Sequence, residues 1–314
     1  HVDLKNLSFI FQKTNRSWMR DSGPIIVKNG DKREALNFHF NGWAKYKNYK
    51  LDRQVPSTVA NYLKIPLIPV FRDGKPVILE GGAIDVNGKG SLLTSEECLM
   101  HPDIQVRNPG FSRADYEAVF REHLGVSNVI WLGDGIFGDD THGHIDDLCR
   151  FVNEDTIITV VESDPKDSNY KALQDNLKRL QAAKLEDGKS PKIVSLPMPT
   201  RLDFDGLRLP ASYANFLILN KSVLVPVFND SKDLEALNLL ARYFLAKHQQ
   251  EPKSKYLEEA WKVTLQTMSI SDGDKEEKLE ALKRAVEYAP RVKEELGQKW
   301  LDESFTTNTE RGKE

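Results

Sequence analysis

The feature that most constrains the fold is a pattern of four predicted β-hairpins at nearly even spacing in the first 230 residues. Each consists of two apolar, β-prone runs joined by a turn rich in Asn, Gly and Asp, which is the usual signature of a hairpin. A polar motif precedes every hairpin and contains Asp21, Glu80, His144 or Asn215. Their spacing of about 60–70 residues indicates a repeated unit, and a circular array would direct all four motifs toward one centre.

The segments between the hairpins complete the repeated unit. The hairpins are predicted over residues 24–38, 83–94, 148–161 and 216–227. Helical patterns cover residues 58–63, 114–121 and 170–185, and strand-like runs cover residues 67–70, 129–132 and 192–196. The unit is therefore hairpin, helix and strand, and we expect a pseudo-symmetric α/β propeller or barrel.

The character of the chain changes after Asp230. A helix is predicted over residues 233–247, a linker over 251–255, a charged amphipathic helical segment over 256–305 and a frayed tail over 306–314. We therefore expect an α/β domain over residues 1–250 and an α-helical C-terminal extension over residues 251–314. A packing appendage is favoured for this extension over a partner-binding module.

Composition excludes several classes of partner. The formal net charge of −3 gives no reason to expect a nucleic-acid or anionic-membrane partner. No apolar run reaches the ~18–20 residues that a membrane span needs. The two cysteines, Cys98 and Cys149, argue against a disulfide framework and favour a reducing, cytoplasmic compartment. The chain begins with His1 rather than Met, so the lack of a visible signal peptide carries little weight.

The third motif suggests proton chemistry. If residues 144–146 are extended, His144 and Asp146 share one face and Ile145 lies on the other, which places a base beside a carboxylate. Residues 138–144 hold several acids and histidines with almost no apolar residue. This composition favours a functional role over a capping turn.

The acids of three motifs would create a negative pocket. Asp21, Glu80 and Asp146 repel one another unless a cation neutralises them. Either a metal ion or an organic cation would serve, and a guanidinium suits paired carboxylates and keeps its charge at any working pH.

Glycine and aromatic residues near these acids fit a flat ligand. Gly81 and Gly82 would let a ligand approach the backbone. Trp18 and Trp43 could stack on a planar cation, with burial in the core as the equally weighted alternative.

A metal-dependent hydrolase is the alternative of a different class. His142 and His144, together with Asp139, Asp140 and Asp146, have ligand-type spacing. The other histidines form no second ligand motif: His1, His39, His101, His123 and His248.

Four motifs together carry a family resemblance. Residues 18–24, 79–82, 141–147 and 209–216 resemble the agmatine deiminases of the Porphyromonas-type peptidylarginine deiminase family, in the guanidino-group-modifying superfamily. The resemblance covers about residues 8–230 and implies a pseudo-fivefold α/β propeller, of which about four modules are visible. It also implies hydrolysis of a guanidine: agmatine would give N-carbamoylputrescine and ammonia, a step toward putrescine and other polyamines.

The resemblance implies a role for each motif residue. Asp21 and Asp146 would hold the guanidinium nitrogens, His144 would act as general acid and base, and Glu80 would support the histidine or the substrate. The resemblance implies no metal and no cofactor, a small-molecule guanidine as the partner, and a possible homo-oligomer. The expected substrate-binding residues are Trp18, Arg20, Gly81, Gly82, Trp43 and Asn215.

The sequence departs from the family at the nucleophile. The family reaction uses a cysteine in a Gly-Gly-x-His-Cys type motif near the C-terminus, and neither Cys98 nor Cys149 stands in such a motif. Cys149 is an odd number of residues from His144, and Cys98 follows two acids that would raise the pKa of its thiol. We therefore expect both cysteines to be structural. We expect the chain to be an incomplete or rearranged member of the family: a fragment, a fusion product or a pseudoenzyme that binds guanidinium without catalysis.

Overall fold

A computed structural model of the chain describes residues 8–219 and 223–250. The chain divides into two compact units, one of residues 3–195 and one of residues 196–314 together with residues 1–2. The predicted linker, charged helical segment and tail over residues 251–314 lie outside the described residues. The predicted boundary at residue 250 therefore stays a prediction.

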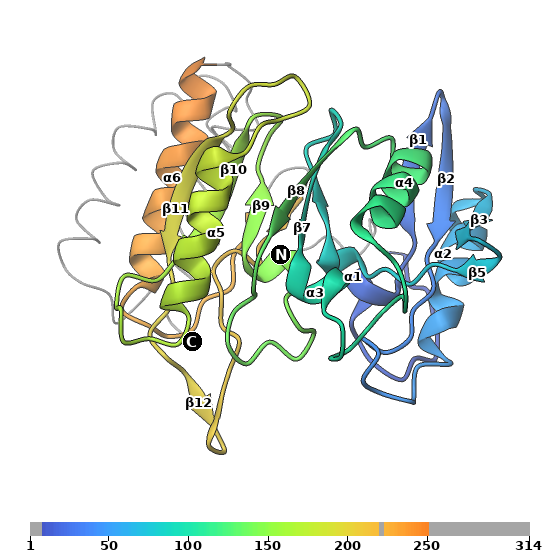
Figure 1. The fold of residues 1–314 in the computed structure, drawn as a ribbon, viewed down its shortest axis with the longest axis horizontal. Helices are drawn as coiled ribbons and strands as arrows, with labels where there is room; N and C mark the ends of the chain where they lie inside the picture. Colours follow the sequence, from blue (N-terminus) through green and yellow to red (C-terminus); the bar gives the residue numbers. More distant parts are fainter. Residues whose placement is uncertain (1–7, 220–222, 251–314) are drawn as a thin grey trace. The chain divides into compact units, whose positions relative to one another are not determined.

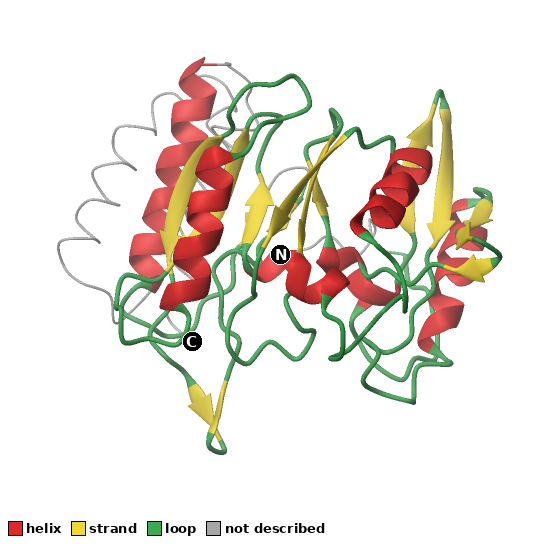
Figure 2. Cartoon of the chain, viewed as in Figure 1, coloured by secondary structure: helices red, strands yellow, loops and turns green. Residues whose placement is uncertain are grey.

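The first unit repeats one module of hairpin, helix and strand (Figures 1 and 2). In the first module, β1 (Ile25–Asn29) pairs antiparallel with β2 (Lys32–Asn37), which pairs parallel with β3 (Leu67–Pro69). Helix α2 (Val55–Leu63) lies between β2 and β3 in the chain and packs on both strands. The predicted first hairpin and its following helix and strand are confirmed.

The second and third modules follow the same order. Strands β6 (Asp85–Val86) and β7 (Ser91–Ser95) form a hairpin, and β8 (Asn128–Leu132) pairs parallel with β7. Strands β9 (Cys149–Phe151) and β10 (Thr156–Val161) form the next hairpin, with β11 (Lys192–Pro197) beside β10.

The helices of these modules have clear local causes. Helix α4 (Arg113–Leu124) begins with a capping box between Ser112 and Asp115, and Gly125 ends it in the left-handed conformation at φ 67°. Helix α5 (Tyr170–Ala182) buries Leu173 and Leu180 and packs on β8 and β10. The predicted helix over residues 170–185 was too long at its C-terminal end, because Ala183 is extended.

Shorter elements connect the modules of the first unit. They are α1 (Met19–Ser22), η2 (Asp52–Gln54), β4 (Phe71–Arg72), β5 (Lys75–Pro76), η3 (Gly81–Ala83), α3 (Glu96–Met100) and η4 (Ile145–Asp147).

The core of the second module is apolar and partly aromatic. Tyr116 and Phe120 of α4 are fully buried, and Phe111 packs edge-on against Tyr116 at 5.2 Å between ring centroids. The apolar side chains of α4 are therefore part of the buried core.

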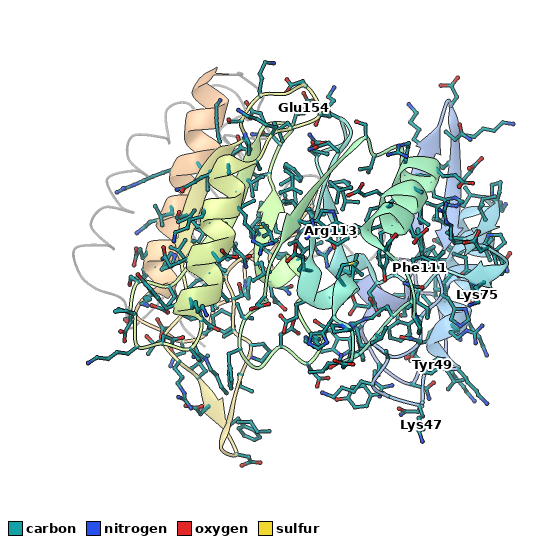
Figure 3. All side chains as sticks on the ribbon, viewed as in Figure 1. Lys47, Tyr49, Lys75, Phe111, Arg113 and Glu154 are labelled. Carbon is teal, nitrogen blue, oxygen red and sulfur yellow. The ribbon has the colours of Figure 1, made fainter. Side chains whose placement is uncertain are left out.

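Exposed charged residues lie outside this core. Figure 3 shows Lys47, in the loop between β2 and η2, extending away from the ribbon into solvent.

The second unit contains the fourth predicted hairpin. Strands β14 (Leu217–Ile218) and β15 (Val223–Leu224) pair antiparallel, as do β12 (Asp203–Phe204) and β13 (Leu207–Arg208). Helix α6 (Asp233–Gln250) covers the helix predicted over residues 233–247. Among the described residues, no helix combines the length and apolarity that crossing a membrane requires.

The observed architecture is mixed α/β. The strands of the described residues form six small sheets, and no closed barrel is found among them. The barrel alternative is therefore not supported.

Candidate active site

Three short helical elements bring the motif residues of the first unit together. Helix α1 contacts η3, and η3 contacts η4. Asp21 lies within α1, Glu80 directly precedes η3, and His144 directly precedes η4, which contains Asp146. Motifs from three different modules therefore meet in the first unit; the predicted meeting of all four motifs stays a prediction, because the fourth motif belongs to the second unit.

His144 lies at the middle of this group. Its Nδ1 is 3.8 Å from Oδ1 of Asp21 and 4.0 Å from Oδ1 of Asp146, and its Nε2 is 3.8 Å from Oε2 of Glu80. All four side chains are buried. We call these four residues the acid–histidine cluster.

Asp21 is fixed from two sides. Nε1 of Trp43 donates a hydrogen bond to its Oδ2 at 3.1 Å, and the backbone N–H of Gly82 donates to its Oδ1 at 3.1 Å. A Cβ at Gly82 would lie 2.4 Å from Nδ1 of His144, so only glycine fits at this position. Close approach was predicted for a ligand, and in the structure it is the cluster's own side chains that approach this glycine.

The loop before η4 is organised by Asp139. Its carboxylate accepts hydrogen bonds from the backbone N–H groups of Thr141 at 2.7 Å, Gly143 at 2.8 Å and His144 at 3.0 Å. His142 and Gly143 both have positive φ, at 65° and 84°. The extended conformation that the sequence analysis considered for residues 144–146 is not the one observed, because residues 145–147 form a 3₁₀ helix that begins at this tight loop.

Arg107 is a member of the site that the sequence analysis missed. Its guanidinium is fully buried, and its Nε donates to Oε1 of Glu80 at 3.2 Å. It also donates to the carbonyl oxygens of Gln105 at 3.0 Å and of Thr141, in the loop before η4. An arginine in a short loop carries no local pattern that would have revealed this contact.

The surrounding charges shift the pKa of each member of the cluster. Burial would raise the pKa of Glu80, but the charges of Arg107 and His144 outweigh it and lower the pKa to about 2. Burial would lower the pKa of His144, but Asp21, together with Cys98 and Glu80, raises it well above its usual value.

The two aspartates behave differently from Glu80. Burial raises the pKa of Asp21, and the charges of Asp146 and Glu80 add to this effect against the attraction of His144. Burial likewise raises the pKa of Asp146, although His144 and Arg20 oppose it. Both aspartates therefore lack part of the positive charge that would stabilise their ionised forms.

The remaining predicted binding residues occupy different positions. Nε of Arg20 pairs with Oδ2 of Asp146 at 3.1 Å, and a Cβ at Gly81 would lie 2.3 Å from the carbonyl oxygen of Arg20. The side chain of Trp18 is 63% exposed. Asn215 is exposed and belongs to the second unit, so its predicted role stays a prediction.

The fourth motif has a structural contact within the second unit. The hydroxyl of Tyr213 donates to Oδ1 of Asp233 at 2.6 Å, and the same carboxylate accepts the backbone N–H of Phe228 at 3.1 Å. The motif therefore connects to the start of α6.

The structure does not assemble the ligand set of the metal-hydrolase alternative. Nδ1 of His142 is 2.8 Å from Oε1 of Glu97 rather than beside His144. Asp139 is used by the backbone of its own loop, and Asp140 by Lys45 and Tyr46. The alternative is therefore not favoured.

The two cysteines differ in their surroundings. Cys149 is buried in β9, and burial raises the pKa of its thiol well above the usual value. Cys98 is also buried, but it offers its sulfur within 4.8 Å of donor atoms of Glu80 and His144. The sequence analysis did not place this thiol beside the cluster, because the contact depends on how α3 packs.

Comparison with known families identifies the chain. The sequence profile of the Porphyromonas-type peptidyl-arginine deiminases matches residues 2–250. The chain belongs to this family. The match extends the resemblance drawn from the four motifs to residues on both sides of them.

Several relatives of this chain are named agmatine deiminases, and a solved structure that is 37% identical, with a TM-score of 0.70 over 76% of this chain and 72% of that chain, is named a putative peptidyl-arginine deiminase. An agmatine deiminase of Pseudomonas fluorescens is 34% identical over 268 residues, which cover 77% of this chain and 71% of the relative. An agmatine deiminase of Pseudomonas syringae pv. tomato gives the same identity and the same coverage.

Solved structures agree with the sequence relatives. An agmatine deiminase of C. jejuni with substrate bound is 34% identical, with a TM-score of 0.70 over 77% of this chain and 69% of that chain. The agmatine deiminase of Enterococcus faecalis is 30% identical, with a TM-score of 0.68 over 74% and 68%. The α/β fold is therefore shared with these deiminases.

Proposed function

We propose that the chain is a guanidine hydrolase of the agmatine deiminase type, which converts agmatine to N-carbamoylputrescine and ammonia and thus serves putrescine formation. The observation that carries the proposal is the acid–histidine cluster, in which three buried carboxyl groups surround one imidazole. The names of the relatives support the same activity.

Two aspartates would bind the substrate's cation. The pKa of Asp21 and that of Asp146 are raised by burial, so a guanidinium beside them would favour their ionised forms. Asp146 already accepts the guanidinium of Arg20 on its Oδ2, which leaves Oδ1 on the side of His144. Carboxylates and guanidinium groups match in geometry as well as in charge.

His144 would carry the protons. The raised pKa favours the protonated imidazole, which can donate a proton to a departing ammonia and, once neutral, accept one from water. Glu80, with its pKa of about 2, would remain ionised and hold the imidazolium through its Oε2. Arg107 would position Glu80 through the other oxygen.

The nucleophile is the part of the reaction for which this site offers no matched residue. The family reaction forms a covalent intermediate on a cysteine in a glycine-rich motif, and neither cysteine of this sequence has that context. Binding of guanidinium without turnover is therefore the second candidate function, and it uses the same cluster.

The experiment is a product assay on the full chain with agmatine, arginine and a peptidyl-arginine. Release of ammonia and a ureido product from agmatine would establish the hydrolase activity, and in that case His144→Ala or Asp146→Asn should abolish the release. Near-normal turnover by either variant would contradict the assigned roles. Agmatine binding without product would establish the second candidate function instead.

Two further expectations complete the proposal. The repeated modules would be blades of a pseudo-fivefold α/β propeller, as the family resemblance implies, with a possible homo-oligomer as the assembly. A cytoplasmic location would fit the use of reduced cysteines.

A further inference from the structure

A cysteine, a histidine and a glutamate converge at one edge of the acid–histidine cluster. One donor atom from each of Glu80, Cys98 and His144 lies within 4.8 Å of the other two, and all three residues are buried. Within the part of the chain that the structure describes, no other three His, Cys, Asp or Glu donors meet in this way. We propose that these three side chains form a binding site for a thiophilic divalent cation such as Zn²⁺ or Cd²⁺.

Two buried polar atoms of these residues have no hydrogen-bond partner among the described residues. These are Nε2 of His144 and Oε2 of Glu80, which are 3.8 Å apart. Tetrahedral zinc, with bonds of about 2.0–2.2 Å to nitrogen and oxygen, places such ligand atoms about 3.3–3.6 Å apart. The histidine and the glutamate are therefore within a few tenths of an ångström of the required separation, and the thiol, whose sulfur lies within 4.8 Å of both donor atoms, needs to move by about 1 Å.

The atoms behind these donors resemble the outer ligands of a metal site. Oε1 of Glu80 accepts a hydrogen bond from Arg107, which leaves Oε2 as the single donor oxygen. Nδ1 of His144 faces the carboxylates of Asp21 and Asp146 at 3.8 and 4.0 Å. Metal-binding histidines and carboxylates normally have such partners, which orient the ligand and increase its basicity.

The charge of the site also permits a cation. A metal binds the thiolate and the neutral imidazole, so it displaces protons from these groups and adds less net charge to the buried group than an ion without such exchange.

Occupation of this site would oppose the activity proposed for the chain. The metal would bind Nε2 of His144, the residue assigned to proton transfer, and Oε2 of Glu80 beside it. This consequence, unlike the site itself, rests on the proposed function. A thiophilic divalent ion is therefore expected to act as an inhibitor.

The test uses Co²⁺ as a spectroscopic probe on the full chain without an affinity tag. We expect one Co²⁺ per chain, a thiolate-to-cobalt charge-transfer band in the near ultraviolet, and displacement by equimolar Zn²⁺. Cys98→Ser should remove the band and weaken binding by more than the about 10–100-fold that loss of an outer partner costs. Cys149→Ser changes the other buried cysteine and should leave the band and the affinity unchanged.

Three results would overturn the proposal: no charge-transfer band in the unchanged chain, a band that persists in Cys98→Ser, or a band that is lost in Cys149→Ser. Should Cys98→Ser fail to fold, X-ray absorption of the zinc-loaded unchanged chain decides. One sulfur ligand at about 2.3 Å supports the site, and a shell of nitrogen and oxygen alone overturns it. Neither measurement needs turnover, so failure of the proposed hydrolase activity would not affect them.

Discussion

At the scale of single residues, the buried ion pair of Arg107 and Glu80 links the stability of the fold to the charge of the cluster. Both side chains are fully buried, and the positive Arg107 lies 3.2 Å from the negative Glu80. Removing one member of a buried pair leaves an uncompensated charge and typically costs about 3–5 kcal/mol. The same carboxylate faces His144, so stability and proton chemistry depend on one contact.

Arg107→Met tests this contact. The free energy of unfolding from denaturant titration should fall by about 3–5 kcal/mol. The matched control is Arg201→Met, because Arg201 pairs with Asp203 at 2.9 Å but both side chains are largely exposed. This control should change stability by about 1 kcal/mol or less. Equal effects of the two substitutions would show that the buried charge of Glu80 is not what Arg107 stabilises.

Sequence reasoning found the titratable residues of the cluster but not their partners. Asp21, Glu80, His144 and Asp146 stand out because polar motifs interrupt apolar, β-prone runs at a regular spacing. Cys98 and Arg107 carry no comparable pattern, since their contacts arise from the packing of α3 and of a loop. Chemistry that depends on tertiary contact was therefore invisible.

At the scale of elements, the hairpins were predictable and the site-bearing turns were not. Alternating apolar runs around Asn and Gly determine the pairing of β1 with β2 and of β9 with β10. Residues 144–147 read equally well as extended, because nothing in their spacing reveals that Asp139 closes the preceding loop. The 3₁₀ geometry of η4 is thus a consequence of a hydrogen-bond network.

The close packing of η3 against His144 leads to a prediction. Gly82→Ala would place a Cβ 2.4 Å from Nδ1 of His144 and 2.8 Å from Oδ1 of Asp21, so the imidazole and the carboxylate must move apart. Agmatine binding measured by calorimetry should be lost or weakened at least tenfold. Gly133→Ala is the control: it also replaces a glycine of the first unit, but its Cβ would meet only the ends of the Asp175 and Arg179 side chains, at 3.2 and 3.3 Å. Unchanged binding in Gly82→Ala would contradict the proposed geometry.

At the scale of the whole molecule, the cluster couples protonation to stability. The pKa of Glu80 is about 2 in the folded state and near 4.5 when unshifted, so its stabilising contribution is fully present above pH 4.5 and is lost as pH falls toward 2. The size of this contribution is on the order of 3 kcal/mol. The pH dependence that His144 causes runs in the opposite direction, because its pKa is raised in the folded state. Its stabilising contribution is present below pH 6.5 and is lost as the pH rises through the folded pKa.

The comparison of the unchanged chain with Glu80→Gln isolates the acidic part of this dependence. The free energies of unfolding of the two proteins should differ most near neutral pH and converge between pH 4.5 and 2. Glu80 of the unchanged chain is protonated in this window, whereas Gln carries no charge at any pH. Denaturant titrations at a series of pH values measure the difference directly. A difference that stays constant across this window would show that Glu80 is not stabilised as an anion.

The α/β class of the chain was predictable from the sequence, but the number of modules around a common centre was not. The repeated modules and the α/β class follow from the hairpin spacing, and the comparisons with solved deiminases support the same fold. The spacing alone does not determine how many blades surround a centre, since it reports only the length of one unit.

Calorimetric titration of agmatine into the full chain tests directly whether the acid–histidine cluster binds a guanidinium. We expect one binding site per chain, with the affinity lowered at least tenfold by Asp146→Asn. Asp140→Asn removes an acid of the same loop that pairs with Lys45 outside the cluster, and it should leave the affinity unchanged. Binding should also weaken as the pH falls. Because the pKa of Asp21 and that of Asp146 are raised above 3.8, these carboxylates become protonated, and lose their attraction for the guanidinium, before the pH reaches 3.8. Equal affinity in Asp146→Asn and the unchanged chain would contradict the assignment of this cluster as the guanidinium site.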